Sequence, residues 1–139
     1  MQRGLLEAGC TVVLNARNAQ ALERTRHELA EQTGGTAYAM PFITSPDAVT
    51  AGVERVEVQA GPLDILVNNA GLQRRAPLLE FSDADWHALV ATNMTSAFLV
   101  GRQVARRMAA RGAGKIVNVC SLQRLRPVLR PAAGGGCRI

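Results

Sequence analysis

Short apolar runs alternate along the chain with longer stretches in which apolar residues recur every three or four positions. The apolar runs indicate strands and lie at residues 10–14, 36–40, 63–67 and 115–119. The periodic stretches indicate helices with one apolar face and lie at residues 19–32, 46–60 and 82–111, and residues 2–8 are typical of the end of a further helix. Because strands and helices alternate, the pattern predicts an α/β protein built from parallel β-α-β units, with a doubly wound sheet.

Residues at the ends of these stretches support the helix assignments. Gly9 suits the C-terminal cap of the first helix. Asn18 suits an N-cap, and Ser82 followed by Asp85 has the spacing of a capping box. Pro46 suits the first turn of a helix, because its missing N–H has no partner there in any case.

The rest of the chain is organised around residues 61–71, with the sequence G-P-L-D-I-L-V-N-N-A-G. Apolar side chains fall on both faces of this run, so we expect a central strand that is covered on both sides. The small and amide side chains of residues 68–71 then end the strand. They let a ligand approach the backbone closely at the carboxyl edge of an open α/β sheet. An ordinary strand followed by an Asn-Gly turn is the alternative interpretation.

Composition narrows the class of protein. The 139 residues are enough for one domain with a core, and no apolar run approaches the roughly 20 residues of a membrane span. The net charge of +5 comes from scattered arginines with few aromatic residues, which disfavours nucleic-acid binding. The three cysteines have no metal-ligand spacing, so we expect no metal site, reduced thiols and a cytoplasmic location.

The last part of the chain has a different character. Residues 123–139 have neither helical nor strand periodicity and consist largely of arginine, proline, alanine and glycine. Such a stretch cannot bury an organised face, so we expect an irregular tail. The predicted domain therefore comprises residues 1–122.

Several polar residues lie where a cofactor or substrate would bind. Arg17 follows the predicted strand at residues 10–14. In dinucleotide-binding folds an acid at this place binds the ribose of NAD, and an arginine accommodates the extra phosphate of NADP. Asn93 is an amide on an apolar helix face, and burying it without partners would cost about 1–3 kcal/mol. Ser121 ends the last predicted strand, and the paired Arg74 and Arg75 suit a carboxylate. The alternatives are a surface arginine at position 17, an amide paired with nearby backbone, a turn-capping serine and a solvated loop.

The phrase D-I-L-V-N-N-A-G resembles the fourth-strand signature of the short-chain dehydrogenase/reductase family, and the resemblance covers residues 1–122. It implies a Rossmann-like fold and hydride transfer with NADP, or alternatively NAD. It implies cofactor contacts from Arg17, Asn69, Ala70 and Gly71. It also implies that Ser121 bonds the reacting substrate oxygen and that Asn93 helps to hold a water of the proton relay. The family is typically homo-oligomeric.

Three further phrases narrow the resemblance within the family. N-N-A-G-L-Q-R-R-A-P-L, F-S-D-A-D-W and I-V-N-V-C-S-L-Q are similar to gluconate 5-dehydrogenases, which interconvert gluconate and 5-ketogluconate. We expect Arg74 or Arg75 to meet the carboxylate of a small sugar acid. Enzymes that act on 2-deoxygluconate or ketodeoxy sugar acids carry a similar arginine pair and are the next alternative.

The chain also departs from the family pattern. The family begins with a strand and a glycine-rich turn that holds the pyrophosphate, and neither is present here. The positions of the family's catalytic Tyr and Lys are occupied by Gly134 and Arg138, while the chain's one Tyr is Tyr38 and its one Lys is Lys115. Residues 42–45 replace a segment that usually contacts the adenine.

These departures predict an incomplete sheet, lacking the first strand and the last strands, in a chain truncated at both ends. Residues 11–16 and 63–67 would each lose a hydrogen-bonding neighbour, at about 1–3 kcal/mol for each unpaired buried group. We expect an inactive fragment that does not hold NADP. The alternative is a non-catalytic remnant or partner-binding protein.

Overall fold

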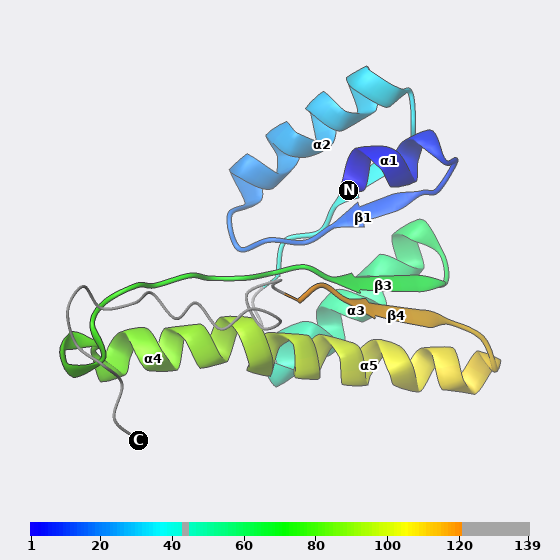
Figure 1. Cartoon of the computed structure of the whole chain (residues 1–139). Helices are drawn as coiled ribbons and strands as arrows, with labels where there is room; N and C mark the ends of the chain where they lie inside the picture. Colours follow the sequence, from blue (N-terminus) through cyan, green and yellow to red (C-terminus); the bar gives the residue numbers. More distant parts are fainter. Residues whose placement is uncertain (43–44, 121–139) are drawn as a thin grey trace, which may run out of the picture.

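The computed structural model of the chain describes residues 1–42 and 45–120 (Figure 1). Its elements, in chain order, are α1 (Gln2–Glu7), β1 (Val12–Leu14), α2 (Ala19–Thr33), β2 (Ala37–Ala39), α3 (Pro46–Ala60), β3 (Ile65–Asn68), the 3-10 turn η1 (Leu78–Glu80), α4 (Asp83–Val90), the π-helical turn η2 (Ala91–Thr95), α5 (Ser96–Arg111) and β4 (Lys115–Asn118). The predicted alternation of strands and helices is confirmed. The predicted tail at residues 123–139 lies outside the described residues.

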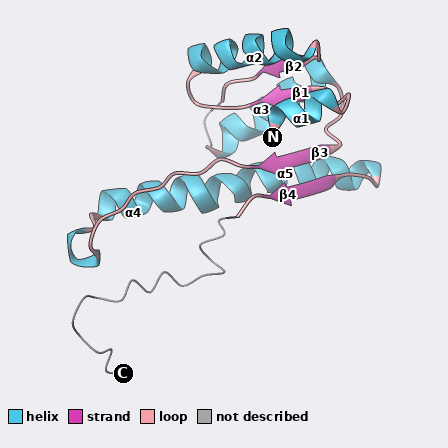
Figure 2. Ribbon diagram, turned by 45° about the horizontal axis from the view of Figure 1, so that its top comes forward, coloured by secondary structure: helices cyan, strands magenta, loops and turns pink. Residues whose placement is uncertain are grey.

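The strands form two parallel pairs, β1 with β2 and β3 with β4. Figure 2 shows them in the order β2, β1, β3, β4, and no strand pairing among the described residues joins β1 to β3. Helices α1 and α2 lie on one side of the strands, and α3 and α5 lie on the other (Figure 1). This arrangement is an incomplete doubly wound, Rossmann-like sheet.

The first core lies between β1, β2 and the helices α1 and α2. Its buried residues are Leu6, Val12, Leu14, Leu22 and Ala37. Residues at the helix ends stabilise these helices. The Asn18 side chain accepts from the amide of Ala21 at 2.9 Å, which confirms its predicted N-cap position. Gly9 follows α1 with a φ of 83°, a conformation that favours glycine.

The second core lies between α3, α5 and β3. Its buried residues are Val49, Val53, Leu99, Val104 and Met108. Phe42 packs against this cluster, and its ring lies directly over Gly52 on α3. A Cβ atom at Gly52 would lie 2.6 Å from the ring, so α3 approaches Phe42 as closely as only glycine permits.

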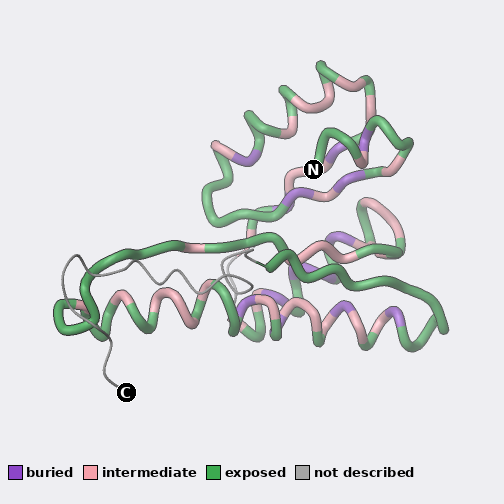
Figure 3. The backbone as a smooth tube through the Cα atoms, in the orientation of Figure 1, coloured by how far each residue is buried: buried purple, intermediate pink, exposed green. Residues whose placement is uncertain are grey.

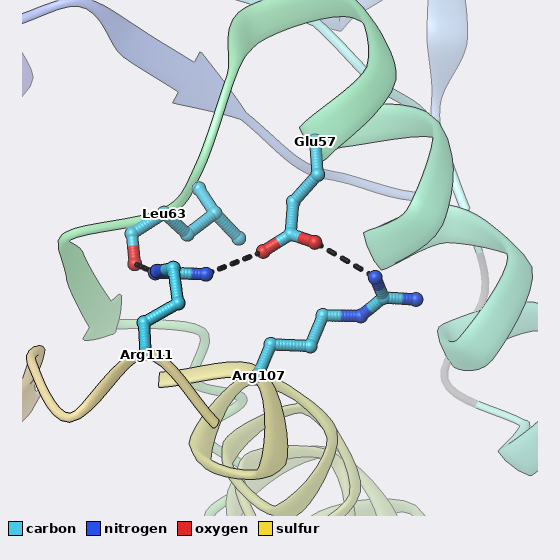
Figure 4. A network of polar contacts seen from close by, with 4 residues as sticks. All are labelled: Glu57, Leu63, Arg107 and Arg111. Atoms are coloured by element: carbon cyan, nitrogen blue, oxygen red, sulfur yellow. Dashed lines mark hydrogen bonds and ion pairs between the residues drawn. The ribbon is translucent and has the colours of Figure 1, made fainter. Parts of the chain in front are cut away.

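An ion-pair network joins α3 to α5 and to the start of β3 (Figure 4). The carboxylate of Glu57 accepts from Arg107 at 2.7 Å and from Arg111 at 3.1 Å. Arg111 also donates to the backbone carbonyl of Leu63 at 2.7 Å. Because the carboxylate is only 18 % exposed, the three side chains form a partly buried clamp between the two helices.

The long helix predicted over residues 82–111 is confirmed as α4, η2 and α5, which follow one another without a break and include one π-helical turn. The capping box at its start is also confirmed, since Ser82 accepts from the amide of Asp85 at 3.1 Å. Val104 and Met108 are buried as expected, whereas Trp86 is 58 % exposed. The prediction of one continuous buried face is therefore wrong. Helix α4 extends beyond the strands, and none of its residues is buried (Figures 1 and 3), so no sheet covers its apolar side chains.

The prediction that the strand at residues 63–67 is covered on both sides is also wrong. Helix α5 packs on one face of β3 and β4, but Ile65 is 45 % exposed and Val117 is 47 % exposed. The reason is that the described residues supply only one layer of helices to this pair of strands. In the same part of the chain, no helix combines the length and apolar character needed to cross a lipid bilayer.

Candidate functional site

The carboxyl ends of β3 and β4 lie side by side. Asn68 is in register with Asn118, and the amide nitrogen of Asn68 donates to the amide oxygen of Asn118 at 2.9 Å. The backbone of Val119 then donates to the carbonyl of Asn68 at 3.0 Å. These bonds align the segment after β3 with the segment after β4, at the edge where open α/β sheets bind ligands.

An open hollow of about 390 Å³ lies at these strand ends, within the size range of small-molecule sites. Its lining includes Asn68 at the end of β3 and Ala70 after it, Asn93 in η2, and Asn118 at the end of β4 and Cys120 after it. Three amide side chains from three elements thus converge on one hollow, which gives it donors and acceptors but no formal charge. Ser121, the residue after Cys120, lies outside the described residues.

Asn93 holds the segment that follows β3. Its Oδ1 accepts from the amide of Leu72 at 2.7 Å, and its Nδ2 donates to the carbonyl of the same residue at 2.9 Å. The Asn93 amide therefore has the hydrogen-bond partners that we expected. Its side chain is exposed, however, whereas its place on an apolar helix face predicted burial. Asn93 lies in the π-helical turn, a feature that is frequent at functional sites. Its part in a proton relay stays a prediction.

Replacing Asn93 with alanine should release this segment. Both hydrogen bonds to Leu72 are lost, and two net bonds are worth about 1–3 kcal/mol of local opening free energy. Amide exchange at Leu72, followed by NMR, should therefore accelerate about tenfold or more. Asn93→Asp is the matched control, because it keeps the acceptor for the Leu72 amide. Unchanged exchange at Leu72 in Asn93→Ala would contradict the assigned role.

The described structure does not require a glycine at position 71. Its φ is not positive, and a Cβ atom would find its nearest neighbour, Oδ1 of Asn93, at 3.9 Å, an ordinary contact. Asn69, Ala70 and Gly71 are all exposed, so their small surfaces are open to an external group. Since neither the backbone conformation nor a neighbouring atom requires glycine at this position, its presence is consistent with close approach by a ligand.

Arg17 lies on a bend beyond β1, is exposed, and forms no ion pair with any described residue. Nearby, Nδ2 of Asn15 donates to the carbonyl of Met40 at 2.8 Å and to that of Phe42 at 3.4 Å. This amide ties the end of β1 to the end of β2. The sequence interpretation missed Asn15, and the signal that could have found it is an amide placed directly at a strand end.

Arg74 and Arg75, the predicted carboxylate-binding pair, lie away from the hollow at the strand ends. Arg74 pairs with Asp85 at the start of α4, at 3.4 Å. With its amide oxygen turned toward the guanidinium, Gln73 accepts from Arg75 at 3.0 and 3.1 Å. The loop that carries them runs alongside α4 (Figure 1), and neither arginine lines the hollow. The structure therefore brings Ala70 and Asn93 together with the β4 end, but does not bring the arginine pair to them.

Comparison with known proteins identifies the fold. The short chain dehydrogenase family model matches residues 1–133. The chain belongs to the short-chain dehydrogenase/reductase family. It is 48 % identical over 123 residues to a gluconate 5-dehydrogenase of Gluconobacter oxydans, covering 88 % of this chain and 48 % of the relative. It is 38 % identical over 123 residues to a 2-dehydro-3-deoxy-D-gluconate 5-dehydrogenase of Formosa agariphila, covering 88 % of this chain and 47 % of the relative.

A solved structure supports the same assignment. The crystal structure of a gluconate 5-dehydrogenase from Burkholderia cenocepacia, in complex with NADP and tartrate, superimposes with a TM-score of 0.75 at 46 % sequence identity. The match covers 88 % of this chain and 48 % of that one. Thus the chain spans about half the length of the short-chain dehydrogenases/reductases that it matches, and gluconate 5-dehydrogenases are among the proteins that it resembles.

Proposed function

We propose that this chain carries the cofactor- and substrate-facing part of an NADP-dependent dehydrogenase that interconverts gluconate and 5-ketogluconate. The observation that carries the proposal is the convergence of Asn68 and Ala70 of the N-N-A-G segment, Asn93 and the end of β4 on one hollow. The likeness to gluconate 5-dehydrogenases, which extends over 88 % of the chain, supports the choice of substrate.

The described residues fit two parts of the cofactor. Arg17, exposed and without an ion pair, would bind the 2′-phosphate that distinguishes NADP from NAD. Asn69, Ala70 and Gly71 would lie against the cofactor at the strand end. No atom of the described residues would clash with a Cβ at Gly71, so a bound cofactor would explain the glycine there. When bound, NADP would accept or supply the hydride.

The proposed substrate contacts come from the loop and the strand ends. Ser121 would bond the reacting oxygen, and Asn93 would hold the backbone around a water of the proton relay. Arg74 or Arg75 would receive the carboxylate of the sugar acid. The Arg74–Asp85 pair does not prevent this, because both side chains are about half exposed and such surface pairs are worth only about 0–1 kcal/mol.

By itself, the chain is proposed to be inactive and not to hold NADP. Tyr38 lies on β2, in the other strand pair, and cannot serve as proton donor at the end of β3. Lys115 begins β4, whereas the hollow lies at the opposite end of that strand, about 10 Å away at 3.3 Å per residue. Neither residue can therefore supply the missing acid–base pair.

A chimera tests the proposal, with residues 1–122 of this chain replacing the matching segment of the Gluconobacter oxydans relative. The chimera should form NADPH from NADP and gluconate. In it, Arg17→Ala should reduce the preference for NADP over NAD about tenfold or more, because a charged hydrogen bond is worth about 1.5–3 kcal/mol. Arg24→Ala, an exposed arginine on α2, is the matched control. Steady-state kinetics with both cofactors measures the preference.

The natural chain, assayed alone, is the negative control and should form no NADPH. Turnover by the chain alone would contradict its proposed inactivity, and a folded chimera without turnover would contradict the proposed reaction. An equal loss with NADP and NAD would contradict the role of Arg17.

The relative that acts on 2-dehydro-3-deoxy-D-gluconate favours a second candidate substrate class, the deoxy sugar acids. Kinetics of the same chimera with gluconate and with the deoxy acid distinguish the two candidate substrate classes. A higher kcat/KM for the deoxy acid than for gluconate would favour the second class. A non-catalytic role for the chain is the remaining alternative, and NADP binding by the chain alone, measured by calorimetry, would favour it.

A further inference from the structure

The bend that carries Arg17 is short and is anchored at both of its ends by amide side chains. It comprises residues 15–18, between the end of β1 and the start of α2. At its far end, the side chain of Asn18 caps α2 by accepting from a backbone amide of the first turn at 2.9 Å. At its near end, Nδ2 of Asn15 donates to the backbone carbonyl of Met40 at 2.8 Å. Two side chains of the bend therefore limit where its backbone can lie.

The segment that accepts from Asn15 is itself well held. Met40 is 8 % exposed, and its amide donates to the carbonyl of Leu14 at 2.9 Å, which continues the hydrogen bonding between β1 and β2. Asn15 also donates to the carbonyl of Phe42 at 3.4 Å, and the Phe42 ring packs over Gly52 on α3. The two carbonyls thus belong to a segment that is tied both to a strand and to a helix, which makes it a firm anchor for Asn15.

The side chain of Arg17 has no comparable support. It is exposed and forms no ion pair within residues 1–42 and 45–120. Its place therefore depends on the backbone of the bend, and Asn15 bonds that backbone to the neighbouring strand. Strands β1 and β2 end at the same edge of their sheet (Figure 2), where open α/β sheets bind ligands.

We propose that Asn15 is a positioning residue for the phosphate site at Arg17. By bonding the end of β1 to the segment after β2, it holds the bend so that the Arg17 guanidinium is presented at the carboxyl edge of the sheet. A 2′-phosphate then meets an arginine whose backbone is already in place, which lowers the ordering cost of binding. NAD lacks this phosphate, so Asn15 contributes to the preference for NADP and not to the affinity for NAD. The inference rests on the proposed NADP dependence and deepens it.

The anchoring bond can be tested in the full chain by itself, without a cofactor. Asn15→Ala should accelerate amide exchange at Met40, followed by NMR, about threefold or more, because one net hydrogen bond to this segment is lost. The amide of Val12, which bonds to Thr36 at the other end of β1, should keep its rate. Unchanged exchange at Met40 would overturn the inference, whichever reaction the protein catalyses.

The effect on cofactor preference is measured in the chimera with the Gluconobacter oxydans relative, as the Kd values for NADPH and NADH from calorimetry. Asn15→Ala should reduce the preference for NADPH about three- to tenfold, the equivalent of one net hydrogen bond, and leave the Kd for NADH unchanged. An unchanged Kd for NADH also shows that the variant is folded. Asn15→Leu keeps the size of the side chain but lacks the donor, so it should behave in the same way. Gln20→Ala, an exposed amide at the start of α2, is the matched control and should change neither value.

A double-mutant cycle separates positioning from general destabilisation. In the Arg17→Ala background, Asn15→Ala should change the preference less than about twofold, because the residue through which it acts is gone. An equal reduction in both backgrounds, or an equal weakening of both cofactors, would overturn the inference.

These are binding measurements, so they distinguish the inference from the proposed reaction. A chimera that has an Asn15-dependent preference for NADPH but does not oxidise gluconate would support the inference and contradict only the reaction. A chimera with no preference for NADPH would overturn the inference together with the proposed role of Arg17.

Discussion

Gly52→Ala should lower the free energy of unfolding by about 1–3 kcal/mol, as overpacking of a filled core does. A loss of stability would be informative, because replacing glycine by alanine inside a helix normally stabilises the protein by about 0.5–1 kcal/mol. Here the new Cβ would lie 2.6 Å from the Phe42 ring, and Gly52 itself is buried. Either the ring or α3 must move, and both contact the second core.

Urea unfolding followed by circular dichroism measures this change. The control is Phe42→Ala combined with Gly52→Ala, since alanine lacks the Cγ, Cδ1 and Cε1 atoms that clash with the new Cβ. In the Phe42→Ala background, Gly52→Ala should be neutral or stabilising. Equal destabilisation in both backgrounds would show that the Phe42 ring is not the cause.

Glu57→Gln should lower the free energy of unfolding by about 1.5–3 kcal/mol, the range for a hydrogen bond to a charged group. Glutamine keeps the shape of the side chain but removes the charge that Arg107 and Arg111 share (Figure 4). Both arginine side chains are about two-thirds covered, so losing the counter-charge leaves two partly buried cations without a partner carboxylate. Helices α3 and α5 and the start of β3 should loosen together.

The matched control is Glu54→Gln on the same helix. Glu54 is exposed and has no ion pair among the described residues, so its replacement should change the stability by less than about 0.5 kcal/mol. Thermal unfolding of the two variants and the natural chain gives the comparison. If both variants lose the same stability, the network does not act as a clamp.

Local elements could be predicted well from the sequence because their signals are local. The helix predicted at residues 46–60 coincides with α3, where Ser45 caps the helix and Pro46 occupies its first turn. The cap at Asn18 and the glycine after α1 are likewise where the sequence places them. These features depend on side chains within four residues of the backbone groups that they satisfy.

The candidate site was only partly predictable. The N-N-A-G segment and Asn93 were identified from their sequence context, and Asn68, Ala70 and Asn93 line one hollow, whereas Asn69 and Gly71 do not. Asn15 was missed, because its partners on the β2 side are about 25 residues away and no short-range pattern reveals them. The pairing of Arg74 with Asp85 was also not foreseen, since it depends on how the loop after β3 lies along α4.

Sequence alone therefore determined the order of strands and helices and the family, because residue identity and short spacing carry that information. Only the tertiary structure decided which apolar surfaces are covered. Trp86 and Ile65 have the pattern of core residues and yet are exposed, because burial requires a neighbouring element on the right side. The division into two strand pairs follows in the same way, since hydrogen bonds between strands join residues that are distant in the chain.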